Sequence, residues 1–128
     1  MTNFEINNIY TVTEKLSEKD QFSDSVLWCL FKLRKDLREH VDFYNERLKS
    51  IQDKYVSYAD ENGQIHGEVM DKYVNDVKEL GLMDKDISNV AKYDISIKEF
   101  KGITVHDMES LEPFINFTNE WTNERKWL

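Results

Sequence analysis

The feature that most constrains the fold is residues 24–61, a long stretch that contains no glycine and no proline. Its apolar side chains recur every three or four residues, a spacing typical of one face of an α-helix. Ser23 precedes the stretch and is a favourable N-cap residue, because its hydroxyl can accept a hydrogen bond from a free backbone amide. The pattern predicts one helix of about 36 residues, roughly 54 Å long.

The apolar seam of this helix changes phase once. It is spaced like a coiled-coil heptad, but two four-residue steps follow one another around Leu37 and Val41. Such a stutter redirects the seam, so we expect the parts before and after it to serve two different packing surfaces. The seam positions are Val26, Leu30, Leu33, Leu37, Val41, Tyr44, Leu48, Ile51, Tyr55 and Tyr58.

The length of the chain limits how such a helix can be accommodated. With 128 residues the chain has the size of one domain, and we expect residues 1–128 to form it. A compact domain of this size is roughly 36 Å across, which is less than the length of the predicted helix. The helix must therefore extend beyond the core, bend, or pack against another chain.

A second helix should follow the long one. Residues 60–63, Asp-Glu-Asn-Gly, are a turn signal. Residues 68–80 then repeat apolar side chains at helical spacing, and Gly81 stands where a C-terminal helix cap is expected. The two helices are predicted to form an antiparallel hairpin.

Residues 93–97 alternate apolar and polar side chains, which predicts a strand. Residues 3–10 and the segment near Ile65 are its candidate partners. Thr104 begins a pattern that resembles a capping box and opens a last helix through Ile115.

Pro113 must kink or restart this last helix, because proline lacks the amide donor. The predicted fold class is mainly α (α+β). It comprises a long helix and an antiparallel helical hairpin with a small two- or three-stranded β element and a C-terminal helix.

The charge of the chain favours some partners over others. With 25 acidic against 17 basic residues, the net charge of -8 at pH 7 would repel a phosphate backbone, so no direct contact with nucleic acid is expected. Residues 60–86 hold eight acidic and three basic side chains, whereas residues 24–59 hold six and seven. A basic protein surface, such as one that itself binds nucleic acid, is the partner that this acidic segment suits.

No arrangement of residues in the sequence indicates catalysis. The histidines His40, His66 and His106 lie in separate predicted elements without metal-ligand spacing, and Cys29 lies in an apolar stretch typical of a buried thiol. Asp60 opens a segment that lacks the glycine and glutamate required of a calcium loop. We therefore expect no enzyme, no metal site and no cofactor.

The composition gives no indication of export or of a membrane partner. The single cysteine excludes an internal disulfide, and no stretch approaches the roughly 20 apolar residues of a membrane span. The first ten residues lack the basic and apolar runs of a signal peptide. We expect a cytoplasmic protein.

Five short segments follow one another along residues 25–117: Leu33-Arg34-Lys35-Asp36-Leu37, the turn from Tyr55 to Gly63, the acidic helix Tyr73 to Leu80, the strand Tyr93 to Ile97, and Ile103-Thr104-Val105 to Leu111. In this order the chain resembles a family of small proteins of unassigned function encoded by phages of Gram-positive bacteria. The resemblance implies a phage setting, hence the host cell cytoplasm, and no catalytic residues.

These observations predict a non-catalytic protein-binding module, namely a phage-encoded inhibitor of a bacterial host or defence (CRISPR-type) nuclease that acts by steric or acidic-surface blockade. The alternative is a phage virion or tail-assembly protein that forms a homo-oligomer, such as a homodimer, through its long helix. The predicted partner-binding residues are two tyrosines, six acids and one tryptophan: Tyr55, Tyr58, Asp60, Glu61, Glu68, Asp71, Asp76, Glu79 and Trp127.

Overall fold

The computed structural model describes residues 1–19 and 21–118. Over these residues the chain forms four α-helices, one short 3-10 helix and a two-stranded parallel sheet, which confirms the mainly α fold class. In chain order the elements are α1 (Asn3–Ser17), α2 (Asp24–Val56), α3 (Gly67–Leu82), β1 (Tyr93–Ser96), η1 (Ile97–Glu99), α4 (Val105–Leu111) and β2 (Ile115–Thr118).

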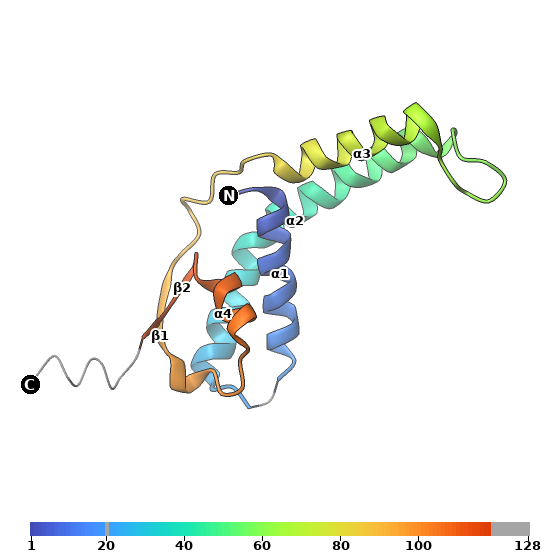
Figure 1. Ribbon diagram of the computed structural model, residues 1–128. Coiled ribbons are helices and arrows are strands. Elements are labelled where there is room, and N and C mark those ends of the chain that lie inside the picture. The colour runs from blue at the N-terminus through green and yellow to red at the C-terminus, as the bar shows by residue number, and fades with distance from the viewer. Residues whose placement is uncertain (20, 119–128) are drawn as a thin grey trace, which may run out of the picture.

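The long helix is α2, which has 33 residues and is therefore roughly 50 Å long. Ser23 is its N-cap, and the Ser23 hydroxyl accepts a hydrogen bond from the Val26 amide at 3.3 Å. The helix ends at Val56, a few residues before the turn at residues 60–63 that was predicted to end it. Figure 1 shows its second half leaving the rest of the fold side by side with α3, so of the three alternatives given above the helix extends beyond the core.

Two packing surfaces divide α2, as the stutter predicted. The first half, up to Val41, belongs to the main core together with α1, α4 and the sheet; we call this part the body. The second half, beyond Tyr44, pairs with α3, and we call this pair the hairpin arm. Tyr44 itself still contacts α1, through the edge-on ring of Phe4, so the change of partner falls just after Tyr44, about one turn beyond the change in phase.

The N-terminal segment is helix α1, so residues 3–10, one of the two candidate partners of the predicted strand, are not that partner. Thr2 and Glu5 form a capping box, in which the Thr2 hydroxyl accepts from the Glu5 amide at 3.2 Å and the Glu5 carboxylate accepts from the Thr2 amide at 3.0 Å. Apolar side chains at helical spacing then bury one face of α1: Ile6, Ile9, Val12 and Leu16.

The partner of β1 is β2, which lies parallel to it with Tyr93 opposite Ile115 and Ser96 opposite Thr118. The prediction of a partner near Ile65 was wrong, since Ile65 lies in the loop of the hairpin arm. The helix opened by Thr104 is α4, and the Thr104 hydroxyl caps the Asp107 amide at 3.1 Å.

The last helix is shorter than predicted. α4 ends at Leu111, and Pro113 lies beyond its C-cap residue. The chain then continues as strand β2 from Ile115 rather than as helix. Helix α4 is thus the crossover between two parallel strands, which require a connection of this kind.

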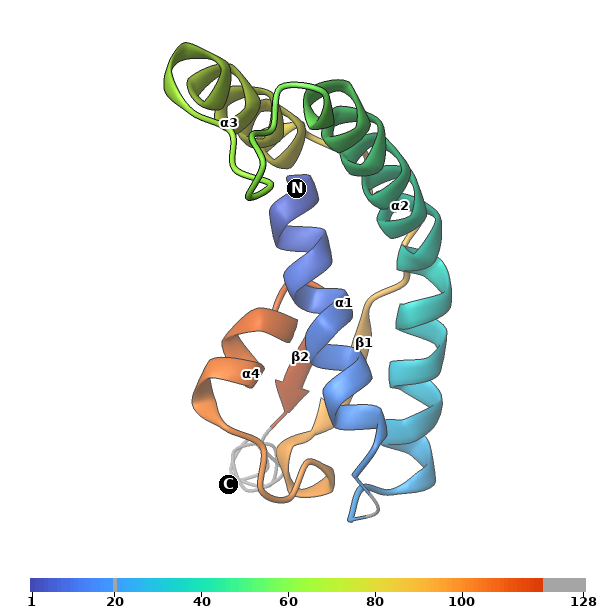
Figure 2. The same ribbon diagram turned by 90° about the vertical axis from the view of Figure 1, so that its right-hand side faces the viewer.

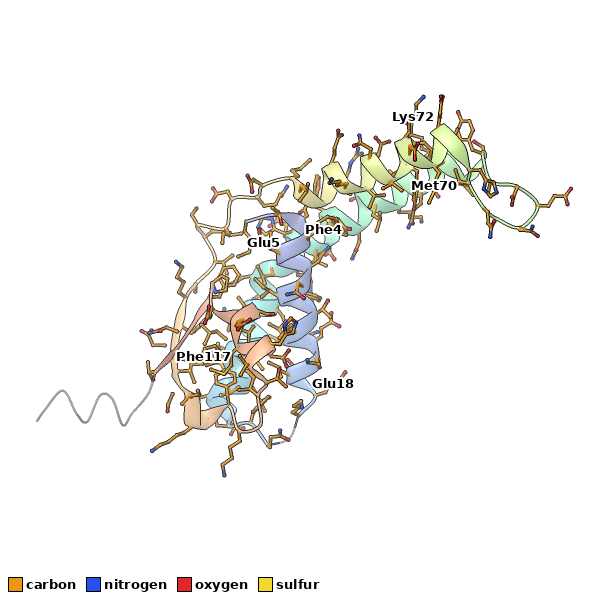
Figure 3. The ribbon with its side chains drawn as sticks, viewed as in Figure 1. Phe4, Glu5, Glu18, Met70, Lys72 and Phe117 are labelled. Atoms are coloured by element: carbon orange, nitrogen blue, oxygen red, sulfur yellow. The ribbon has the colours of Figure 1, made fainter. Side chains whose placement is uncertain are left out.

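Gly81 is not a helix cap. α3 continues through it to Leu82, and Met83 is the C-cap residue. Gly81 itself is buried. A side chain at Gly81 would overlap the ring of Phe4 from α1. Figure 3 places Phe4 where α1 meets the hairpin arm, so glycine is needed there for close approach of the two helices.

Candidate protein-binding site

The hairpin arm is held together by a contact between the two helices near its end. Tyr55 of α2 is 5% exposed, and its hydroxyl donates to the Asp76 carboxylate of α3 at 2.6 Å. The Tyr73 ring stands edge-on to Tyr55 with centroids 5.4 Å apart, and the Lys54 ammonium lies 3.7 Å from the same Asp76 carboxylate.

This contact engages two predicted partner-binding residues and takes one of them, Tyr55, away from the surface. The hydrogen bond to Asp76 raises the pKa of Tyr55 to about 12, with burial adding to the effect, so the phenol keeps its proton at neutral pH. Tyr55 and Asp76 therefore join the two helices of the arm; Tyr55 is closed to a partner, whereas the Asp76 side chain stays 31% exposed.

The loop between the helices is folded around one carboxylate. Asp60 accepts hydrogen bonds from the backbone amides of Asn62 at 2.8 Å and Gln64 at 3.0 Å, and its other oxygen lies 2.7 Å from Nε2 of His66. These bonds, of which the one from Gln64 has the largest effect, lower the pKa of Asp60. Gly63 takes a positive φ of 76° within the loop, which confirms the predicted turn.

The end of the arm also has an apolar component. A shallow cavity of about 460 Å³ is lined by Gly63, Gln64, Ile65, His66, Met70 and Tyr73. Tyr58 is 60% exposed, and Val56, Met70 and Val74 are exposed as well. In Figure 3, Met70 and Lys72 point away from α3 on different sides. We call Val56, Tyr58, Ile65, Met70 and Val74 the tip residues.

Four predicted acids lie on the outside of the arm and form no ion pair with another described residue: Glu61, Glu68, Asp71 and Glu79. Glu79 accepts a hydrogen bond from the Asn75 amide group at 3.1 Å, one turn earlier on α3. The structure thus brings these acids and Tyr58 onto one projecting element. Trp127 lies outside the described residues.

Sequence reasoning missed an exposed aromatic pair on the body. Trp28 and Phe31 of α2 are 62% and 53% exposed, and their rings stack with centroids 5.6 Å apart and planes at 29°. The signal was available, because at about 100° per residue both side chains fall opposite the buried seam that begins at Val26.

Cys29 is buried, and burial raises the pKa of its thiol to about 11. Over residues 1–19 and 21–118, no cluster of three or more His, Cys, Asp or Glu residues is placed to hold a metal ion. In the same part of the chain, no helix has the length and apolar character needed to cross a membrane.

The sequence matches no family model, and comparisons with curated proteins and with solved structures give no significant match.

Proposed function

We propose that this protein is a non-catalytic protein-binding module whose hairpin arm contacts a basic surface of another protein. The observation that supports the proposal is the arm itself, which projects from the body (Figure 1). It carries four acids that form no ion pair with another described residue, of which Glu61, Glu68 and Asp71 lie near the apolar tip residues and Glu79 lies toward the body. Protein interfaces combine an apolar centre with a polar rim. Acidic side chains around that centre steer a basic partner into contact.

The resemblance to phage proteins suggests the class of partner. In a phage setting the partner would be a bacterial host or defence nuclease of the CRISPR type, and the protein would act as its inhibitor. Such nucleases hold nucleic acid in positively charged channels. An acidic arm of two helices would occupy such a channel, or cover its entrance, and so block access of the nucleic acid.

A different observation supports the alternative function, which is a virion or tail-assembly protein that associates through its long helix. The overhang of α2 packs on α3 within the same chain, with its seam residues Leu48 and Ile51 left half-buried. The exposed pair of Trp28 and Phe31 lies on the other half of α2 and is the feature that favours self-association.

Charge reversal separates the arm from the rest of the surface. Tagged protein is used to capture partners from host lysate at low and moderate salt, as wild type, as an arm variant and as a control variant. Each exposed ion pair contributes about 0.2–1 kcal/mol, so reversing four acids should weaken capture roughly fivefold to a thousandfold. The arm variant carries lysine at Glu61, Glu68, Asp71 and Glu79, and the matched control carries lysine at four exposed acids outside the arm, Glu14, Glu18, Asp42 and Glu109.

The proposal expects a basic host protein on the wild type and the control variant, and a strong loss on the arm variant. Equal loss on both variants would indicate that overall charge, not the arm, governs binding. Recovery of no host protein at either salt concentration would count against a host partner. Inhibition of the captured nuclease in a cleavage assay then distinguishes an inhibitor from a passive ligand.

A further inference from the structure

The first turns of α2 expose two large aromatic side chains on the surface of the body. Trp28 and Phe31 lie side by side on an ordered helix, both more than half exposed. Figure 2 shows α2 along one edge of the molecule, with its outer side uncovered by any other described element. Exposed aromatic pairs of this kind mark interaction sites, because tryptophan is among the residues that contribute most to binding energy.

The charges around this pair form a regular pattern. Asp24 precedes Trp28 by four residues and Lys35 follows Phe31 by four. The four residues are therefore separated by four, three and four positions along the helix. All four side chains are exposed. At this spacing they lie along one stripe of the helix, opposite the core positions. We call Asp24, Trp28, Phe31 and Lys35 the outer stripe.

The outer stripe is complementary to itself in reverse order. In two antiparallel helices related by a two-fold axis midway between Trp28 and Phe31, Trp28 of one copy faces Phe31 of the other, and Asp24 faces Lys35. Four aromatic rings then fill the centre, and an ion pair closes each end. A parallel arrangement would instead place Asp24 against Asp24 and Lys35 against Lys35, which is repulsive.

We propose that the protein forms a two-fold dimer in which the outer stripe of α2 packs antiparallel on the outer stripe of a second copy. Such an isologous contact uses the same patch on both subunits and closes after two. The exposed parts of the two aromatic side chains amount to roughly 250 Å² per copy, well below the approximately 800 Å² per partner of a standard interface. The dimer is therefore weak, with a dissociation constant in the micromolar range or above.

The test is an exchange of charges, read out by sedimentation equilibrium at physiological salt over about 5–500 μM protein. Asp24→Lys and Lys35→Glu each create like-charge contacts at both ends and should weaken the dimer at least threefold. The double variant restores opposite charges and should recover the wild-type dissociation constant. The single variants change the net charge of the chain in opposite directions, so a pure net-charge effect would move their affinities oppositely.

Two further variants test the aromatic centre. Trp28→Ala should weaken the dimer tenfold or more, whereas Val56→Ala, at an exposed apolar position of the same helix, should leave it unchanged. Thermal melts followed by circular dichroism show that each variant is folded. A wild type that is monomeric throughout this range, or a dimer that ignores both Trp28→Ala and the charge exchange, would overturn the proposal. The arm variant should dimerise like the wild type, so this proposal can fail independently of the hairpin arm.

Discussion

Replacement of Gly81 by alanine sets two opposing effects against each other where the hairpin arm meets the body. The position is helical and its φ is not positive, so alanine suits the backbone and should stabilise α3 by about 1 kcal/mol through helix propensity. The added methyl group, however, would overlap the ring of Phe4. The ring must therefore move away from α3.

The cost of moving the ring follows from what Phe4 contacts. Phe4 is 42% exposed, and burial of the remainder is worth about 1–2 kcal/mol. Its edge-on contact with Tyr44, at 6.3 Å between centroids, adds about 0.5–1.5 kcal/mol. Most of this is lost when the ring swings out, so Gly81→Ala should destabilise the protein by a net 1 kcal/mol or so, roughly 3–5 °C in melting temperature.

A double-mutant cycle isolates the clash. In Phe4→Ala protein the ring is absent, so adding Gly81→Ala should now stabilise by about 1 kcal/mol. Urea denaturation of the four proteins gives the free energies of unfolding. The change of sign is the result that matters: if Gly81→Ala destabilises the Phe4→Ala protein as much as the wild type, then the clash with Phe4 is not the reason for glycine at this position.

The remaining predictions concern two titrating groups. The pKa of Asp60 is lowered in the folded loop. The stabilising effect of its carboxylate is therefore present above the unfolded pKa near 3.9 and is lost as the pH falls through the lower folded pKa. The Asn62 and Gln64 amides should lose hydrogen-exchange protection in that pH range, and the Asp60→Asn variant should show no such transition. Because burial raises the pKa of Cys29 to about 11, iodoacetamide at pH 8 should alkylate it at least about a hundredfold more slowly in native than in denatured protein, from ionisation alone. Equal rates would mean that Cys29 is accessible.

The long helix and the hairpin arm could be predicted because their signals are local. The absence of glycine and proline, the cap at Ser23 and the seam spacing act within one helix, and they also located the change in packing surface near Val41. The register of the sheet could not be predicted in this way. It pairs Tyr93 with Ile115 across helix α4, and only tertiary packing selects that parallel partner.

Two other errors arose because one residue type serves two structural purposes. A glycine near the end of a helix is typical of a cap, yet Gly81 permits the close approach of Phe4, and the sequence pattern is the same. Tyr55 and Tyr58 are successive members of one seam, yet Tyr55 is buried against α3 and Tyr58 is exposed. Which tyrosine of the candidate site is available depends on where the loop leaves the helix, a boundary that the sequence pattern placed about three residues too late.

The two proposed surfaces occupy different halves of one helix, and this has a consequence for binding. A dimer formed through the outer stripe would carry two hairpin arms, one from each copy, and the second arm would meet its target at a high effective concentration once the first is bound. A weak dimer would then gain stability on a partner that presents two basic sites. Trp28→Ala should therefore reduce capture of such a partner although Trp28 lies on the half of α2 that packs in the body, whereas capture of a partner with a single site should not change.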